Sequence, residues 1–442
     1  MLGRSKDSKD QVAGLAEENV RLKRALEELA ILNDLARDIA GTLDRERVIN
    51  SIVRRSLQVV EAEQGVVTLV EKKTVDEDDL MKTLVRTNLT TSTAGTAYHF
   101  DRSLLGWMQI HKKPLLTNGP REDDRFRGVK WEESIRNLLS VPLMVKSELT
   151  GVLSVYNKKG EGGFTADDQR ILAIIAGQSA QVVESARLYE EEKALSRVRE
   201  ELRFASDIQQ GLLPKAAPTV ERYDIAGKTI PAQDVGGDYF DFIAVRDGRL
   251  AFCLGDVTGK GLPAAMLMSN LQATIRGQTL ADCTPCECMS RSNELLYRST
   301  DPVKFATLFY GVLCREKDEV CYCSAGHDRP YLLSEGKDPV RLEPGGMMLG
   351  AMEGVPYEHD CLFFAPGDTL VVYSDGITEA MAAGGGELGE EFGEERLEPL
   401  LRENFGKSSA EIVDAVVKAV RAHTAGRAQS DDMTLVVVRR TD

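Results

Sequence analysis

The second half of this 442-residue chain carries five short motifs, most of them acidic, that follow apolar runs. Four of the five set an aspartate beside glycine, serine or a second aspartate. Such an aspartate lies on a tight turn at the end of a strand, where carboxylates from several strands can meet. In chain order the motifs are GGDYF at 236–240, GDVTGKG at 255–261, SAGH at 324–327, YSDG at 373–376 and SDDMT at 430–434.

These motifs predict a site for divalent cations. Carboxylates that converge with no lysine or arginine nearby repel one another. A divalent cation removes that repulsion, and ligands that are all oxygen favour Mg²⁺ or Mn²⁺ over zinc or copper. The residues that this argument brings together are Asp238, Asp256, Asp375, Asp431 and Asp432.

Length and composition limit the class of protein. A chain of 442 residues is too long for one ordinary domain, so two or three are expected. The apolar fraction of 42% and the charged fraction of 28% are ordinary for a globular protein. A net charge of -15 with no basic stripe argues against nucleic-acid binding. The sequence has no apolar run near 18 residues and no apolar signal segment at 1–10, so we expect no membrane span and a cytoplasmic location.

The cysteines admit two interpretations. All eight lie at or after Cys253, and Cys283, Cys286 and Cys288 form a C-x-x-C-x-C cluster that is compatible with zinc. However, Thr284 and Pro285 are typical of an N-cap and first helical residue, so the cluster lies across the start of a helix. No second pair with zinc-like spacing follows. We therefore expect reduced, structural thiols.

Two segments show heptad periodicity. Residues 10–36 place valine, leucine and two asparagines at a and d positions, which favours a parallel dimer. The second segment, 186–214, has the same spacing but an imperfect seam, with Glu191 at a d position and Gln209 at an a position. We expect a homodimer joined through these coiled coils. The alternatives are an amphipathic helix packed on its own domain for the first segment and a solvated helix for the second.

The segment between the two helices has the pattern of an α+β domain. Strands are expected at 65–70, 138–145 and 151–157, followed by a helix over 164–186. The strand pair VPLMV and GVLSVYNK, and the GFT segment before Asp167 and Asp168, resemble the end of a GAF domain. That resemblance implies a sensor domain that binds a small molecule or simply dimerises, and the ligand is left open.

The C-terminal segment alternates strands with long helices, which indicates layered α/β packing. Its motifs, together with IQQGLLP at 208–214 and FATLFYG at 305–311, resemble the metal-dependent protein phosphatases (PPM family) in their SpoIIE/RsbU-like branch. The expected fold class is therefore an α+β multidomain protein. It comprises an N-terminal coiled coil at 1–36, a GAF α/β sensor domain at 37–185, a helical coiled-coil linker at 186–214 and a β-sandwich flanked by helices at 220–440.

The resemblance implies a role for each acidic residue. Asp256 would bridge two Mn²⁺ or Mg²⁺ ions, and the backbone carbonyl of Val257 would contact one of them. Asp238, Asp375 and one of Asp431 and Asp432 would complete the metal ligands, with Asp431 favoured. Asp256, Asp238 and Asp375 are the expected catalytic residues, since the metals would activate a water for attack on phosphorus. His327 is expected in a packing role rather than as a general acid.

The function that follows is a sensor-regulated protein serine/threonine phosphatase. The substrate implied by the resemblance is a phosphorylated anti-sigma-factor antagonist, a small STAS-domain protein in partner-switching signalling. The alternative is a dimeric scaffold that binds a phosphorylated partner without turnover. GGDYF also resembles a diguanylate cyclase signature and 255–261 a phosphate loop, but the first has Tyr239 at an acidic position and the second lacks the hydroxyl residue at Gly261.

Overall fold

A computed structural model describes residues 45–71, 82–90, 102–127, 129, 131–281, 283–301, 303–314, 316–343, 345–383 and 389–441. The chain divides into two compact units, Met1–Ser196 and Arg197–Asp442. The first expected coiled coil, at 10–36, lies outside the described residues. Within the described ranges, no helix is long and apolar enough to cross a membrane.

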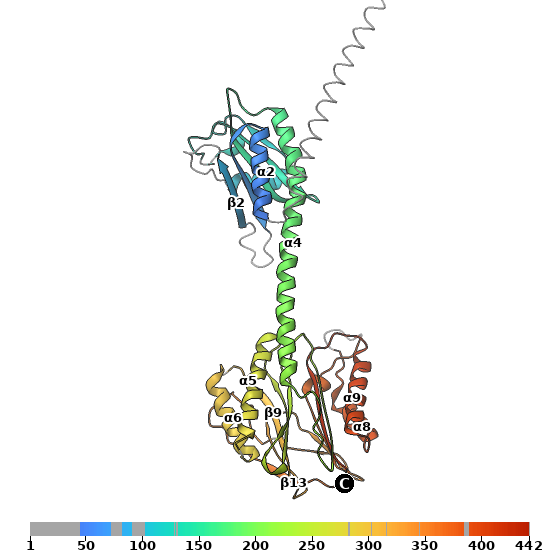
Figure 1. The fold of residues 1–442 in the computed structure, drawn as a ribbon. Coiled ribbons are helices and arrows are strands. Elements are labelled where there is room, and N and C mark those ends of the chain that lie inside the picture. The colour runs from blue at the N-terminus through green and yellow to red at the C-terminus, as the bar shows by residue number, and fades with distance from the viewer. Residues whose placement is uncertain are drawn as a thin grey trace, which may run out of the picture. The chain divides into compact units, whose positions relative to one another are not determined.

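The first unit is built on one antiparallel sheet (Figure 1). The strand order is β2-β1-β5-β4-β3. Helix α2 and the start of α4 cover one face through a shared apolar core, and α3 packs on the other. The elements are α2 Arg45–Val59, β1 Ala62–Glu71, β2 Lys82–Thr90, α3 Arg102–His111, β3 Leu115–Thr117, η1 Asp124–Phe126, β4 Leu138–Val145, β5 Glu148–Lys158 and α4 Ala166–Leu212.

The second unit packs two five-stranded sheets face to face. One sheet has the order β13-β10-β9-β8-β7 and the other β12-β11-β14-β15-β6. The strands are β6 Tyr223–Ile230, β7 Tyr239–Ala244, β8 Leu250–Val257, β9 Ala306–Cys314, β10 Glu319–Ala325, β11 Tyr331–Leu333, β12 Val340–Arg341, β13 Asp360–Phe363, β14 Thr369–Tyr373 and β15 Met433–Arg440.

Helices cover the outer face of each sheet, which gives four layers. Helices α5 and α6 pack on the first sheet, whereas α8 and α9 pack on the second (Figure 1). Apolar side chains of both inner faces, including Phe252, Phe309 and Val436, fill the space between the sheets. The remaining elements are η2 Arg246–Gly248, α5 Leu262–Thr279, α6 Pro285–Ser299, α7 Asp375–Thr378, α8 Gly393–Glu403 and α9 Ser409–Thr424.

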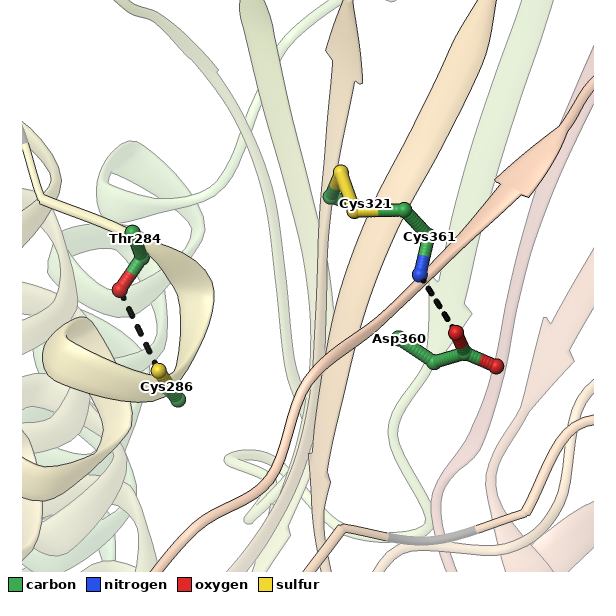
Figure 2. Close-up of a disulfide and its surroundings, with 5 residues drawn as sticks. All are labelled: Thr284, Cys286, Cys321, Asp360 and Cys361. Carbon is green, nitrogen blue, oxygen red and sulfur yellow. Dashed lines mark hydrogen bonds between the residues drawn. A yellow bond between two sulfur atoms is a disulfide. The ribbon is translucent and has the colours of Figure 1, made fainter.

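The cysteine cluster lies at the start of α6, as the sequence predicts. The Thr284 hydroxyl accepts from the Glu287 N–H, the Glu287 side chain accepts from the Thr284 N–H, and Pro285 occupies the first turn. This reciprocal cap fixes where the helix begins. Thr284 and Cys286 also lie within hydrogen-bonding distance through Oγ1 and Sγ, at 3.2 Å (Figure 2).

The expectation of reduced thiols is wrong for one pair. Cys321 on β10 stands directly opposite Cys361 on β13 in antiparallel register, and the two form a disulfide (Figure 2). Their Cα atoms are 4.0 Å apart although 40 residues separate them in sequence. The other six cysteines are free thiols. The disulfide depends on the pairing of β10 with β13, which the spacing of cysteines in the sequence does not reveal.

Candidate metal centre

The sequence-predicted aspartates lie at neighbouring strand ends of the two sheets. Asp238 immediately precedes β7, and Asp256 is the penultimate residue of β8, its neighbour in the first sheet. Asp375 follows β14 by two residues, and Asp432 immediately precedes β15, the strand paired with β14. A Cβ added at Gly237 would stand 3.3 Å from Asp256 Oδ1 and 3.1 Å from the Val257 carbonyl oxygen, so backbone and carboxylate approach closely here.

Asp238 is the most deeply buried of these carboxylates. Its side chain is 4% exposed, and in the described part of the chain its Oδ2 has no hydrogen-bond partner. Burial, followed by the negative charge of Asp256, raises the pKa of Asp238 well above its usual value. A buried, unpartnered carboxylate oxygen is costly unless a proton or a cation reaches it.

Burial and nearby negative charge also raise the pKa of two neighbouring carboxyl groups. Burial and the charges of Asp375 and Asp431 raise the pKa of Asp256 to about 7. Burial and the charge of Asp431 also raise the pKa of Asp375. Mutual repulsion among buried oxygens is what a divalent cation relieves, so this set of donors fits Mg²⁺ or Mn²⁺.

The two adjacent aspartates of the last motif have different surroundings. Asp432 accepts backbone hydrogen bonds at both oxygens: Oδ1 from Ala232 N at 2.7 Å, and Oδ2 from Gly237 N at 2.5 Å and Asp238 N at 3.3 Å. Asp431 is more exposed, and its Oδ2 lies 2.9 Å from Lys260 Nζ. Asp432 therefore holds the backbone of 232–238, whereas the Asp431 carboxylate remains near the open side of the site.

Lys260 is the residue that the convergence argument missed. That argument supposed no cation nearby, yet the Lys260 ammonium also donates to the Ser430 carbonyl at 2.7 Å. Its hydrogen bond to Asp431 raises the pKa of Lys260. The signal was present in the sequence, since Lys260 belongs to the GDVTGKG motif. The ion pair offsets part of the negative charge at the exposed edge but leaves the Oδ2 atom of Asp238 without a hydrogen-bond partner.

The five aspartates are neighbours, but their carboxylates do not surround a common position that a metal ion could occupy. In the described ranges, no group of three or more histidine, cysteine or acidic side chains is arranged to hold a metal ion as it stands. The hydrogen bonds of Asp432 and the ion pair of Asp431 account for two of the five carboxylates.

His327 is placed as a packing residue. It is 5% exposed, and its Nδ1 lies 2.9 Å from the Thr307 hydroxyl on β9. Burial lowers the pKa of His327 to about 4. The imidazole is therefore neutral at pH 7 and lacks the imidazolium proton that a general acid would release.

Comparison with known families identifies both units. Residues 42–184 match the family model of the GAF domain, and residues 246–441 match that of stage II sporulation protein E (SpoIIE). Two consecutive segments of the chain thus match the families that the motifs predict, a GAF domain followed by a SpoIIE-type domain.

Individual relatives are more distant. The chain is 30% identical to protein IcfG of Synechocystis sp. over 269 residues, which covers 55% of this chain and 42% of IcfG. It is 28% identical to the phosphoserine phosphatase RsbU of Bacillus subtilis over 258 residues, 57% of this chain and 75% of RsbU. The SiaA PP2C domain of Pseudomonas aeruginosa aligns with a TM-score of 0.49 at 22% identity, covering 56% of this chain and 99% of that domain.

The raised carboxyl pKa values predict how pH and metal act on stability. Some carboxyl groups have a higher pKa in the folded protein than in the unfolded chain, where it is about 3.9. The stability that such a group contributes is fully present at pH values below the unfolded-state pKa. It is lost as the pH rises through the folded-state pKa. For Asp256 that window extends from about pH 4 to about pH 7. Mn²⁺ should therefore raise the melting temperature more at pH 8 than at pH 5, where protons compete for the same oxygens.

Thermal unfolding with Mn²⁺ or with chelator, at both pH values, measures this difference. The Asp256→Asn variant should lose most of the pH dependence of the Mn²⁺ effect. Asp234→Asn provides the matched control, because Asp234 lies in the loop that leads to Asp238 and is exposed. Equal stabilisation of the wild type by Mn²⁺ at pH 5 and pH 8 would contradict the account.

Proposed function

We propose that this chain is a metal-dependent protein serine/threonine phosphatase whose GAF domain regulates the SpoIIE-type domain. The observation that carries the proposal concerns Asp238, the aspartate of the GGDYF motif. Its buried Oδ2 atom has no hydrogen-bond partner, and burial and the charge of Asp256 raise its pKa. A buried carboxyl group whose pKa is raised by burial and by the charge of a neighbouring aspartate belongs to a site that favours cations. A purely structural turn would expose these groups to water instead.

Asp256, Asp238, Asp375 and Asp431, with the Val257 carbonyl, would hold two Mn²⁺ or Mg²⁺ ions. When bound, such ions lower the pKa of a water and neutralise charge on a phosphoryl group. The assignment of Asp431 as a ligand rather than Asp432 is supported by their surroundings. Asp432 is buried and accepts three backbone N–H groups, whereas Asp431 is more exposed and accepts one backbone N–H beside the Lys260 ammonium. Asp432 would orient the loop that carries Asp238.

Three other groups, His327, the cysteine cluster and Lys260, would differ in what they contribute to this reaction. The lowered pKa of His327 keeps it neutral, so the leaving oxygen would take its proton from water. The cysteine cluster at the start of α6 has no part in this chemistry. Lys260, at 55% side-chain exposure beside Asp431, is placed to attract a phosphorylated partner to the exposed edge.

We further propose a phosphoserine or phosphothreonine on a STAS-domain anti-sigma-factor antagonist as the substrate. This choice is supported by the similarity to RsbU, a phosphoserine phosphatase, and by the SpoIIE-type domain. The regulatory signal would be a small molecule at the GAF domain or a change in its dimerisation.

Replacing Asp256 by asparagine tests the function directly. Asp256→Asn should reduce Mn²⁺-dependent phosphate release from a phosphorylated STAS protein by several orders of magnitude, because the charge that would hold both ions is removed. Asp234→Asn, in the neighbouring exposed loop, should retain wild-type turnover. Near-normal turnover by Asp256→Asn would overturn the mechanism. Binding of the phosphoprotein by wild type without any phosphate release would favour the scaffold alternative.

The second part of the proposal is a homodimer through α4. Leu188, Leu195 and Val198 occupy a and d positions and are 50%, 59% and 52% exposed in the single chain. Exposed apolar side chains at heptad spacing favour a partner helix. Gln209, placed at an a position from the sequence, instead has its side chain buried against Gly236, so the seam would end before it.

Substitutions at the exposed positions test the dimer without disturbing either core. Leu195→Glu combined with Val198→Glu should convert a dimer into a monomer, since two charges would face their copies across the seam. Light scattering of the full chain measures the mass. Lys193→Glu is the control, because it introduces the same side chain at a position outside the seam. A monomeric wild type, or a double variant that stays dimeric, would contradict a homodimer joined through α4.

A further inference from the structure

The last turn of α4 carries one buried polar side chain among exposed neighbours. Gln209 is 8% exposed, whereas Ile208 is 69% exposed and Gln210 is also exposed. The Gln209 Nε2 donates to the Gly236 carbonyl at 2.6 Å, and the Gly236 N–H donates to Gln209 Oε1 at 3.0 Å. One carboxamide thus satisfies both backbone groups of a single glycine, as a neighbouring strand would.

The other side of the same loop is held by Asp432. Its Oδ2 accepts from Gly237 N and Asp238 N, the two residues that follow Gly236. A Cβ at Gly236 would collide with this carboxylate, so only glycine permits the close approach. The Gly236–Asp238 backbone therefore lies between a side chain from the helix and a side chain from the strand end.

The helix end has independent anchors. Leu213, just beyond α4, packs against apolar clusters on both faces of the first sheet, and Gln272 Nε2 of α5 donates to the Leu212 carbonyl at 3.4 Å. Since these contacts do not involve Gln209, loss of its carboxamide would leave the helix end in place. The expected effect is then confined to the loop that carries Asp238.

We propose that Gln209 is a positioning residue that holds the Gly236 peptide so that the Asp238 carboxylate lies ready to bind a divalent cation. The inference rests on the proposed function, and it identifies the contact through which the last turn of α4 acts on the metal site. A rotation or shift of this turn would break the paired hydrogen bonds and release the loop. The position of the helix would then set the affinity for the cation.

The test replaces Gln209 by methionine, which has a similar shape but cannot form either hydrogen bond. Mn²⁺ binding to the full chain, measured by calorimetry without substrate, should weaken by roughly ten-fold, the size expected from losing one or two buried hydrogen bonds. The Mn²⁺ concentration for half-maximal phosphatase activity should rise by a similar factor, while turnover at saturating Mn²⁺ stays near wild type. Gln210→Met is the matched control and should change neither quantity.

The outcomes separate this inference from the proposed function. Wild-type Mn²⁺ affinity in Gln209→Met would overturn the inference, as would an activity loss that excess Mn²⁺ does not restore. If Gln209→Met fails to fold by circular dichroism, Gln209→Asn, which keeps the amide but cannot reach both groups, must show the same weakening. If wild type and Gln210→Met bind Mn²⁺ but release no phosphate, the proposed function fails while the affinity comparison still decides the role of Gln209.

Discussion

The burial of Asp238 beside Asp256 is the constraint on which the rest of the site depends. Two carboxylates removed from water and placed near each other are unfavourable when both are ionised. Protonation relieves the repulsion at low pH, and the raised pKa of both groups is the sign of this conflict. At neutral pH a divalent cation relieves the same repulsion without neutralising the ligands. The SpoIIE-type domain thus keeps an unfavourable arrangement that the cation would make favourable.

The surrounding structure holds this arrangement in place mainly through the backbone. Asp432 accepts three N–H groups from the segment that leads to Asp238, and Gln209 pairs with Gly236 from the opposite side. Beneath them, apolar side chains of both sheets form a closely packed core. The loop is therefore fixed by groups on three separate elements, one of which is the helix that follows the GAF domain.

The sequence predicted those features that depend on local pattern. The strand at 138–145 matches the structure residue for residue, since a continuous apolar run bounded by turn residues marks a buried strand. The motif aspartates lie at or beside strand ends because the glycines and serines next to them favour turns. Sequence reasoning missed contacts that depend on which strands are neighbours. The disulfide joins β10 to β13, and Lys260 reaches Asp431 across 171 positions.

The contact made by Gln209 is a further feature that the sequence pattern does not reveal. Its position in a heptad predicted a weak point of a coiled-coil seam, because periodicity describes only how one helix repeats. Its two hydrogen bonds to Gly236 depend on where the helix ends against the sandwich, which no local pattern encodes. The polar residue that interrupts the heptad pattern is thus explained by its tertiary contact with the loop that carries Asp238.

The central proposal is that Asp238 and Asp256 would form a binding site for two divalent cations. Anomalous diffraction at the manganese edge, from crystals of the full chain grown with Mn²⁺, tests it most directly. The account predicts two manganese peaks beside the carboxylates of Asp238 and Asp256. Crystals in which no manganese lies at Asp238 and Asp256, or in which metal binds only at the cysteine cluster of α6, would contradict it.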